Sequence, residues 1–121
     1  MTKSVLVVDD EATFSFALEH LMKSEGYSVE TAQCGKEAID LVMERHPDLV
    51  LLDASLPDRD GYDVCQTIRS DQRSQDIKIV MMNAGSRDIE IEKGLSVGAH
   101  RCLSKPFSLQ KVAQTVEELL K

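Results

Sequence analysis

Three aspartates stand at the ends of two strongly aliphatic segments of this sequence. Asp9 and Asp10 directly follow residues 4–8 (SVLVV), and Asp53 closes residues 48–53 (DLVLLD). Two carboxylates about 4 Å apart repel each other by about 4 kcal/mol at an effective dielectric constant near 20, so carboxylates gathered in one place require a cation. Because magnesium prefers oxygen ligands, this residue set predicts a magnesium site.

Two further polar residues, Asn83 and Lys105, follow two later aliphatic segments. A lysine ammonium is a compact cation that can hold a phosphoryl oxygen. A carboxylate beside both a metal ion and an ammonium can act as a nucleophile and form an acyl phosphate. The chemistry that these residue types predict is phosphoryl transfer, provided that the fold brings the residues together.

The elements that must position these residues alternate between strands and helices. Residues 4–8 and 48–53 are nearly all aliphatic, which is typical of strands covered on both faces of a parallel sheet. Gly26 is expected to close the first helix as a left-handed cap, and Pro47 to stop the second. The expected strands are residues 4–8, 27–32, 48–53, 77–82 and 100–104, and the expected helices lie around residues 14–22, 38–43, 64–68, 88–97 and 109–120.

This alternation predicts an α/β fold with a doubly wound parallel sheet. A chain of 121 residues is long enough to bury a substantial core and is the size of one domain, so we expect a single domain over residues 1–121. In doubly wound folds the ligand crevice lies outside the carboxyl ends of the strands. The three aspartates, Asn83 and Lys105 all follow expected strands, so we expect the functional site at that edge.

Composition narrows the possible partners. With 21 acidic and 14 basic residues the net charge is −7, so this segment has no basic field to attract nucleic acid or an anionic membrane. No apolar run is long enough for a transmembrane helix or a signal sequence, and we expect a cytoplasmic protein. The cysteines, Cys34, Cys65 and Cys102, show no ligand-like spacing, and we interpret them as partly buried thiols.

Other site types fit the sequence less well. Asp58, Asp60 and Gly61 resemble part of a calcium loop, but the further acids of a twelve-residue EF-hand are missing, so we interpret them as turn residues. A nucleotide site of the flavodoxin type needs a phosphate cradle after the first strand, where the acids of DDEATF repel phosphate. A phosphatase of the haloacid dehalogenase type needs a DxD motif and a cap, which VVDDE does not offer.

Four segments together resemble the receiver domain of two-component response regulators, a CheY-like family. They are VLVVDDE, DLVLLDASLPDRDG, VMMNAGSRD and GAHRCLSKPF, in the order and spacing of that family and across the whole chain. The resemblance implies a five-stranded sheet in the order 2-1-3-4-5 with five helices.

The resemblance also assigns roles to individual residues. Asp53 is implied as the phosphoacceptor, with Asp10 as a direct magnesium ligand and Asp9 acting through a metal-bound water. Ser55 is implied to lend its backbone carbonyl to the metal, and Lys105 to pair with Asp53 or its phosphoryl group. Pro106 follows Lys105 as in the family, where that peptide bond is typically cis.

Two residues depart from the family pattern. The position at the end of the fourth strand, where the family places Ser or Thr, is Asn83, and the aromatic position of the fifth strand is Cys102. A thiol cannot sweep out the volume of a ring, so the family's coupled movement of hydroxyl and ring is not available in its usual form. We interpret Cys102 as a packing residue, with a redox role as the alternative. Gly94 falls inside the expected fourth helix, where it costs about 1 kcal/mol relative to alanine and leaves the helix easier to rearrange.

Two functions follow as hypotheses. The first is a signalling receiver that takes a phosphoryl group from a histidine kinase or histidine phosphotransfer protein and presents a changed surface on the fourth helix, fifth strand and fifth helix to a downstream effector. Such a protein is a phosphoacceptor and catalyses only its own phosphorylation and dephosphorylation. The small residues Ser55 and Gly85 then border the phosphoryl group. The alternative is an interaction module (pseudo-receiver) whose binding does not depend on phosphorylation, as Asn83 and Cys102 suggest.

Overall fold

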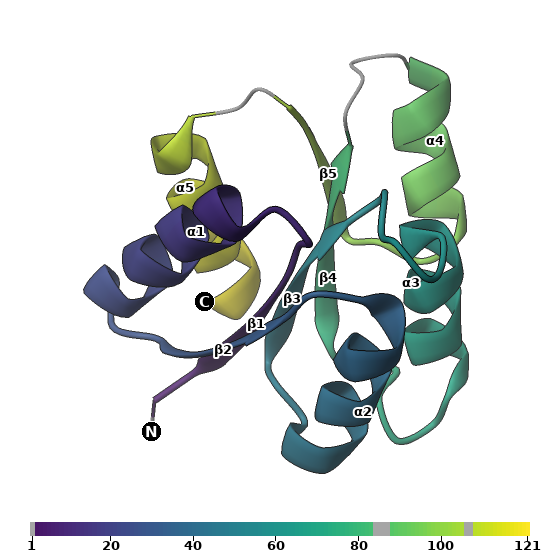
Figure 1. Cartoon of the computed structure of the whole chain (residues 1–121), viewed down its shortest axis with the longest axis horizontal. Helices are drawn as coiled ribbons and strands as arrows, with labels where there is room; N and C mark the ends of the chain where they lie inside the picture. Colours follow the sequence, from purple (N-terminus) through teal and green to yellow (C-terminus); the bar gives the residue numbers. More distant parts are fainter. Residues whose placement is uncertain (1, 84–87, 106–107) are drawn as a thin grey trace.

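The structure is a computed structural model that describes residues 2–83, 88–105 and 108–121 of the chain. The described residues form one parallel sheet in the order β2-β1-β3-β4-β5, which confirms the predicted doubly wound fold and its strand order (Figure 1). The strands are β1 (Ser4–Val8), β2 (Ser28–Ala32), β3 (Leu49–Asp53), β4 (Lys78–Asn83) and β5 (Arg101–Ser104).

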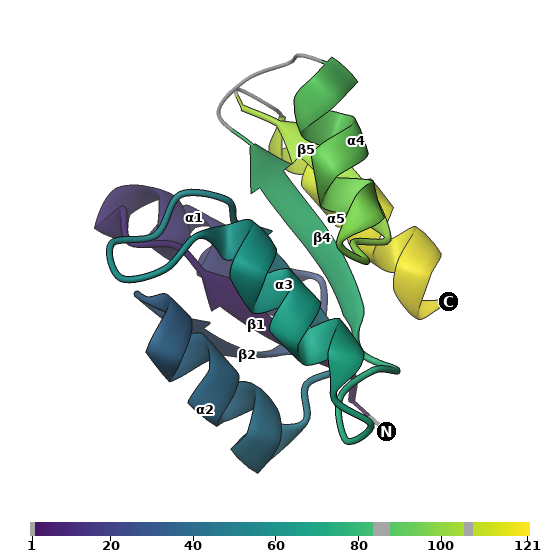
Figure 2. The ribbon, with the colours of Figure 1, turned by 90° about the vertical axis from the view of Figure 1, so that its right-hand side faces the viewer.

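Helices cover both faces of the sheet. Helices α1 and α5 lie against one face, and α2, α3 and α4 lie against the other (Figures 1 and 2). The helices are α1 (Ala12–Ser24), α2 (Gly35–Arg45), α3 (Gly61–Ser70), α4 (Asp88–Ser96) and α5 (Leu109–Leu120).

The alternation of side chains along the strands explains this three-layer arrangement. In β1, Val5 and Val7 belong to the core formed with Leu18 of α1 and Val112 of α5. Leu6 and Val8 point to the opposite face and belong to the core formed with α2 and α3. Successive side chains of a strand point to opposite faces, so an all-aliphatic strand supplies both cores. All five residues of β3 are buried: the four aliphatic residues, as their sequence predicts, and also Asp53.

The predicted boundaries agree with the structure within a few residues. Strand β1 and helix α5 have the predicted bounds, and Gly26 follows α1 with a φ of +94°, the left-handed conformation that ends a helix. The expected end of the fourth strand was one residue short, because Asn83 is the last residue of β4 and pairs with Ser104 of β5. Helix α2 also begins earlier than its apolar pattern indicates, at Gly35.

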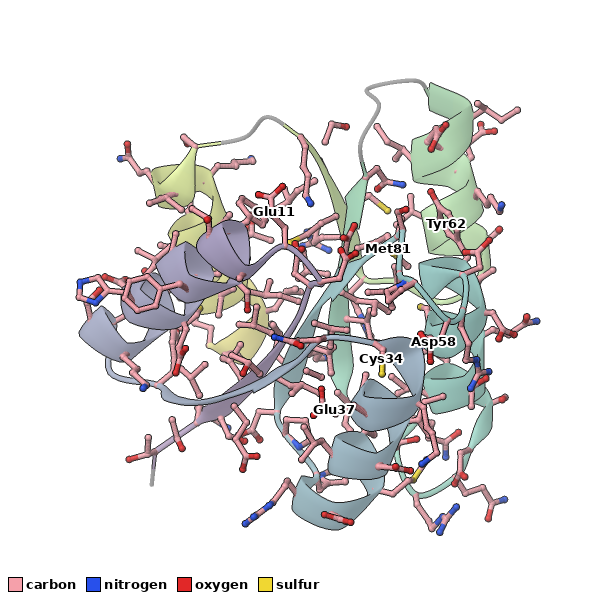
Figure 3. The ribbon with its side chains drawn as sticks, in the orientation of Figure 1. Glu11, Cys34, Glu37, Asp58, Tyr62 and Met81 are labelled. Atoms are coloured by element: carbon pink, nitrogen blue, oxygen red, sulfur yellow. The ribbon has the colours of Figure 1, made fainter. Side chains whose placement is uncertain are left out.

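The early start of α2 has a tertiary cause. The residue before the helix, Cys34, makes no capping hydrogen bond with its side chain. Asp58, from the loop after β3, accepts hydrogen bonds from the backbone N–H groups of Gly35 (2.7 Å) and Lys36 (3.0 Å) (Figure 3). The Asp58 carboxylate therefore satisfies free donors at the amino end of α2, where negative charge is also favoured. Those two hydrogen bonds hold the pKa of Asp58 below its usual value.

Candidate functional site

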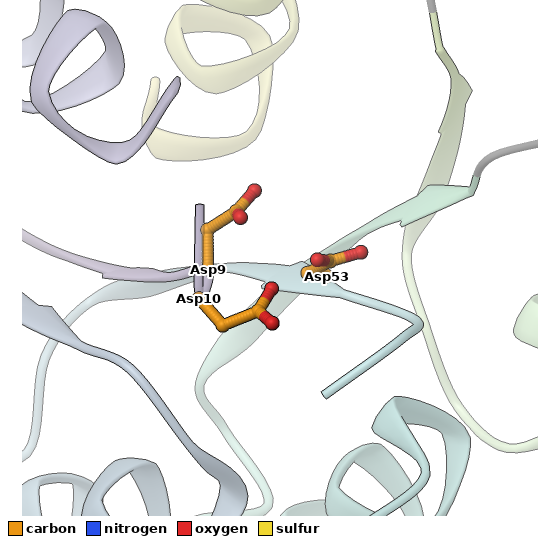
Figure 4. Close-up of side chains that lie close together, drawn as sticks. All are labelled: Asp9, Asp10 and Asp53. Atoms are coloured by element: carbon orange, nitrogen blue, oxygen red, sulfur yellow. The ribbon is translucent and has the colours of Figure 1, made fainter. Parts of the chain in front are cut away.

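The three predicted carboxylates meet at the carboxyl edge of the sheet. Asp9 and Asp10 follow β1, Asp53 ends β3, and each offers an oxygen atom such that all of these atoms lie within 4.8 Å of one another (Figure 4). Strands β1 and β3 are parallel neighbours in the sheet, with Val8 paired to Leu52, so their ends lie side by side. This register, and not proximity in sequence, brings Asp53 to the acidic pair.

Asp9 and Asp10 have different surroundings. Asp9 is only 1% exposed, and its Oδ1 accepts a hydrogen bond from the backbone N–H of Glu11 at 2.9 Å. Its Oδ2 accepts from the Nζ of Lys105 at 3.3 Å. Asp10 is exposed, and within the described parts of the chain no donor is hydrogen-bonded to its carboxylate. The carboxylate of Asp10 is therefore the more available of the two for direct contact with a cation.

Asp53 is buried, yet it has two stabilising neighbours. The backbone N–H of Ser55 donates to Asp53 Oδ1 at 3.2 Å, and Lys105 Nζ lies 3.7 Å from the same oxygen. Burial nevertheless raises the pKa of the Asp53 carboxyl, and the charges of Asp9 and Asp10 add to this effect, while the Ser55 N–H and Lys105 oppose it. The site thus sets three acids against the one ammonium of Lys105, and a bound cation would further stabilise ionised Asp53.

Lys105 bridges the two buried acids. Its Nζ is closer to Asp9 Oδ2 (3.3 Å) than to Asp53 Oδ1 (3.7 Å), so in this state the lysine is shared between the two acids. The ammonium also lies 4.5 Å from the centre of the Phe14 ring, a cation–π contact that the sequence did not reveal. The backbone N–H of Lys105 donates to the carbonyl of Asn83, which fixes the start of the lysine loop to the end of β4.

The loop after β3 is folded tightly against the acidic site. Ser55 pairs with Asp60 in an isolated bridge, and the Asp60 carboxylate caps α3 by accepting from the backbone N–H of Tyr62 at 2.8 Å. A Cβ atom at Gly61 would lie 2.2 Å from the carbonyl oxygen of Asp53 and 2.7 Å from Cα of Ala54. Only glycine therefore allows α3 to begin this close to Asp53. The turn predicted for residues 58, 60 and 61 thus positions the start of α3 beside the acidic site.

Asn83 is fully buried at the end of β4, and its side chain is hydrogen-bonded to a residue that the sequence analysis did not single out. The Asn83 Nδ2 donates to the hydroxyl of Tyr62, near the start of α3. Across the described residues, Asn83 Oδ1 has no hydrogen-bond partner. No pattern in the sequence pointed to Tyr62, because a single aromatic residue at the start of a helix looks like an ordinary core residue.

Cys102 lies in β5 and packs against α4. Its Sγ lies 3.6 Å from the carbonyl oxygen of Ile91, and burial raises the pKa of its thiol. The thiol form is therefore favoured, which supports the packing interpretation over a redox role. Gly94 of α4 faces this sulfur, and a Cβ atom there would lie 2.5 Å from it. Glycine at residue 94 thus allows α4 to pack closely on Cys102, a role that the helix pattern in the sequence did not indicate.

Two further sequence expectations fall outside the described residues. They are the small residue Gly85 beside the expected phosphoryl position and the peptide bond that precedes Pro106. In the described ranges, no helix combines the length and apolar character needed to cross a bilayer.

Comparison with known proteins agrees with the geometry. The sequence model of the response regulator receiver domain matches residues 5–117. A response regulator structure from Chloroflexus aurantiacus is 31% identical, with a TM-score of 0.94 over 99% of this chain and 98% of that one. The chemotaxis response regulator CheY4 of Vibrio cholerae is 26% identical, with a TM-score of 0.93 over 98% of this chain and 99% of that one. The BeF3-activated receiver domain of DrrB is 25% identical, with a TM-score of 0.90 over 99% and 98% of the two chains.

The match extends over nearly the whole sequence, and it coincides with the doubly wound sheet and with acids gathered at its carboxyl edge. The chain therefore belongs to the response regulator receiver domain family of two-component signalling proteins.

Proposed function

We propose that this chain, as one receiver domain over residues 1–121, accepts a phosphoryl group on Asp53 from a histidine kinase or a histidine phosphotransfer protein in a magnesium-dependent reaction. The observation that carries this proposal is the cluster of Asp9, Asp10 and Asp53 with the Nζ of Lys105 3.7 Å from Asp53. A nucleophile, a cation site and a fixed ammonium are the parts that phosphoryl transfer needs.

The donor set fits magnesium. The cluster offers carboxylate oxygens within 4.8 Å of one another, and an ion with metal–oxygen distances of about 2.0–2.1 Å binds ligands up to about 4.2 Å apart, so small side-chain adjustments suffice. Asp10, which is exposed and has no hydrogen-bonded donor among the described residues, suits direct contact. Asp9, whose oxygens already accept two hydrogen bonds, suits contact through water. Ser55 is proposed to add its backbone carbonyl. Magnesium, when bound, neutralises negative charge on the acids and on the phosphoryl oxygens.

The reaction is a transfer between two nucleophiles. A carboxylate oxygen of Asp53 attacks the phosphorus of the donor phosphohistidine, the new O–P bond forms, and the P–N bond breaks as the imidazole leaves. Lys105, already beside Asp53 Oδ1, is positioned to pair with a phosphoryl oxygen of the product. Water attack on phosphorus later breaks the O–P bond and returns the carboxylate. The chain thus acts as a phosphoacceptor whose catalysis is confined to its own modification.

Exposed apolar residues support an output surface on α4, β5 and α5. Ile89 and Leu95 of α4 and Leu109 of α5 are among the exposed large apolar side chains. A downstream effector domain or protein is proposed to bind this face, in a cytoplasmic setting and without nucleic acid or membrane bound by this segment. The net charge of −7 supports the last point.

The experiment is incubation with acetyl phosphate and magnesium, followed by intact mass. We expect one phosphoryl adduct on the wild type, none after chelation of magnesium, and none on Asp53→Asn. Asp63→Asn is the matched control, because Asp63 is an exposed acid of α3 paired with Arg59 away from the cluster, and it should keep the adduct. An equal adduct on Asp53→Asn would overturn the assignment.

A second candidate is an interaction module whose binding is independent of phosphorylation. It is favoured by Asn83 and Cys102, which replace the hydroxyl and the ring of the family's switch. Beryllofluoride, the activating group of the DrrB neighbour, distinguishes the two functions. A partner affinity that changes with beryllofluoride and magnesium excludes this module, and an unchanged affinity favours it.

A further inference from the structure

A line of polar contacts runs from the end of β4 to helix α4. Asn83 Nδ2 donates to the Tyr62 hydroxyl, and that hydroxyl donates to Glu90 Oε2 of α4 at 3.4 Å. Lys93, one turn further along α4, places its Nζ 4.4 Å from the centre of the Tyr62 ring. The Tyr62 side chain, labelled in Figure 3, is only 8% exposed, and its hydrogen bond to Glu90 is partly buried. The Tyr62 side chain therefore contacts both the acceptor edge of the sheet and the helix proposed for output.

Asn83 is tied to the acceptor site by its backbone. It follows Met82, which pairs with Asp53 in the sheet, and its carbonyl accepts the backbone N–H of Lys105. Asn83 is thus held between the strand that carries the phosphoacceptor and the loop that carries the lysine.

Strand β5 offers no ring that could report on the site. Its Cys102 is packed against Gly94 so closely that a single added carbon at Gly94 would lie 2.5 Å from the sulfur. Burial and the negative charge of Glu90 raise the pKa of Tyr62, which keeps its hydroxyl protonated and able to donate. Tyr62, from α3, is the aromatic side chain that lies between Asn83 and α4.

The hydrogen count at this contact creates two alternative arrangements. A tyrosine hydroxyl has one hydrogen to donate, and an asparagine amide has two donor hydrogens and one acceptor oxygen. At present the Tyr62 hydrogen goes to Glu90, and the buried Asn83 Oδ1 is left unpaired in the described structure. If the amide turns over, Oδ1 can accept the Tyr62 hydrogen, but Glu90 then loses it. The unpaired oxygen makes the present arrangement costly and the exchange accessible.

We propose that Tyr62 is the positioning residue that couples the acceptor site to α4. After phosphorylation, the amide of Asn83 turns over, so that its Nδ2 donates to a phosphoryl oxygen on Asp53 and its Oδ1 accepts from the Tyr62 hydroxyl. The hydrogen bond from Tyr62 to Glu90 then breaks. This coupling rests on the proposed phosphorylation of Asp53. It gives the chain a route from site to output helix that needs neither a hydroxyl at residue 83 nor a ring at residue 102.

The test is hydrogen exchange of the α4 amides, with and without beryllofluoride and magnesium. In the wild type, we expect exchange in α4 to rise about tenfold on addition, the factor that corresponds to about 1.4 kcal/mol. In Tyr62→Phe, which keeps the ring, α4 should exchange faster from the start and show less than about a twofold further rise, since the bond to Glu90 is already absent. Tyr27→Phe removes the only other tyrosine hydroxyl and is the matched control, which should behave as the wild type.

A second measurement covers a Tyr62→Phe protein that fails to fold. The chain has two tyrosines and no tryptophan, so in Tyr27→Phe the ultraviolet emission comes from Tyr62 alone. This emission should change on addition of beryllofluoride and magnesium, and the change should vanish when Asn83→Ala is added.

The outcomes separate the coupling from the function on which it rests. A phosphoryl adduct on the wild type with unchanged α4 exchange, or a full rise in Tyr62→Phe, overturns the coupling alone. Unchanged Tyr62 emission in the Tyr27→Phe protein with beryllofluoride bound overturns it as well. The absence of any phosphoryl adduct on the wild type overturns the proposed function and the coupling together.

Discussion

Replacing Gly94 by alanine tests whether local helix preference or tertiary packing governs α4. Alanine is favoured over glycine inside a helix by about 1 kcal/mol, so local preference alone predicts that Gly94→Ala stabilises the fold. The structure predicts the opposite, because the new Cβ would lie 2.5 Å from Cys102 Sγ. Helix α4 packs on β5 with no space for that carbon.

The size of the effect follows from the overlap. A comfortable contact needs about 3.5 Å, so the sulfur or the helix must move by about 1 Å. Moving the sulfur also disturbs its contact with the Ile91 carbonyl, and side-chain atoms of Met81 already lie 3.7 Å from the same Cβ position. Overpacking of this kind costs about 1–3 kcal/mol, which meets or exceeds the gain in helix preference.

A double-mutant cycle separates the two effects. Urea unfolding is measured for the wild type, Gly94→Ala, Cys102→Ala and the double variant. With the sulfur removed, Gly94→Ala should raise the free energy of unfolding by about 1 kcal/mol, whereas in the wild type it should lower it or leave it unchanged. The difference between the two backgrounds is thus about 1–3 kcal/mol. If Gly94→Ala has the same effect in both backgrounds, within about 0.3 kcal/mol, the packing argument is refuted.

Three other perturbations have defined outcomes. The backbone N–H of Ile79 donates to Nδ1 of His100, and the pKa of this histidine is lowered by burial and by the nearby cations Arg69, Lys78 and Arg101. As the pH falls, His100 therefore takes up a proton in the unfolded chain before it does so in the folded protein. The free energy of unfolding should consequently fall as the pH drops below about 6.5. Urea midpoints between pH 7.5 and 5 should decline less steeply in His100→Gln, and equal slopes would argue against this role. Gly61→Ala places a Cβ atom 2.2 Å from the backbone oxygen of Asp53, so it should lower the free energy of unfolding by about 3 kcal/mol or more, and an unfolding midpoint like that of the wild type would contradict the close approach. Lys105→Gln removes a cation from beside Asp9 and Asp53, so it removes a charge that repels magnesium. Calorimetry should show magnesium binding tightened severalfold, while the yield of phosphoryl adduct falls. Weaker magnesium binding would contradict a lysine shared between the two acids.

The strand pattern was predictable because burial on both faces leaves a direct trace in sequence. Residues 4–8 read as an aliphatic strand and form β1 with those bounds, and β3, which is aliphatic up to its final Asp53, is within one residue of its prediction. The start of α2 was not predictable, since its capping carboxylate, Asp58, lies 23 residues away from Gly35 in sequence. A helix end fixed by tertiary contact has no local signature.

In the candidate site, too, some contacts were predictable from sequence and others depend on tertiary structure. Asp9, Asp10, Asp53 and Lys105 could be placed together because parallel strands bring their carboxyl ends to one edge. The hydrogen bond of Asn83 to a helix-start tyrosine depends on side-chain directions in three dimensions, and sequence spacing does not encode it. The metal and phosphoryl roles of these residues stay predictions until the chemistry is measured.

The clamp of Asp58 on the start of α2 has a consequence for the order of folding. The first turn of α2 finds its capping partner only after β3 and the following loop have taken their places. The amides of Gly35 and Lys36 should consequently become slow to exchange late during refolding, together with the β3–α3 loop and later than the centre of their own helix. These two amides would then serve as a probe of loop closure from a distant part of the chain.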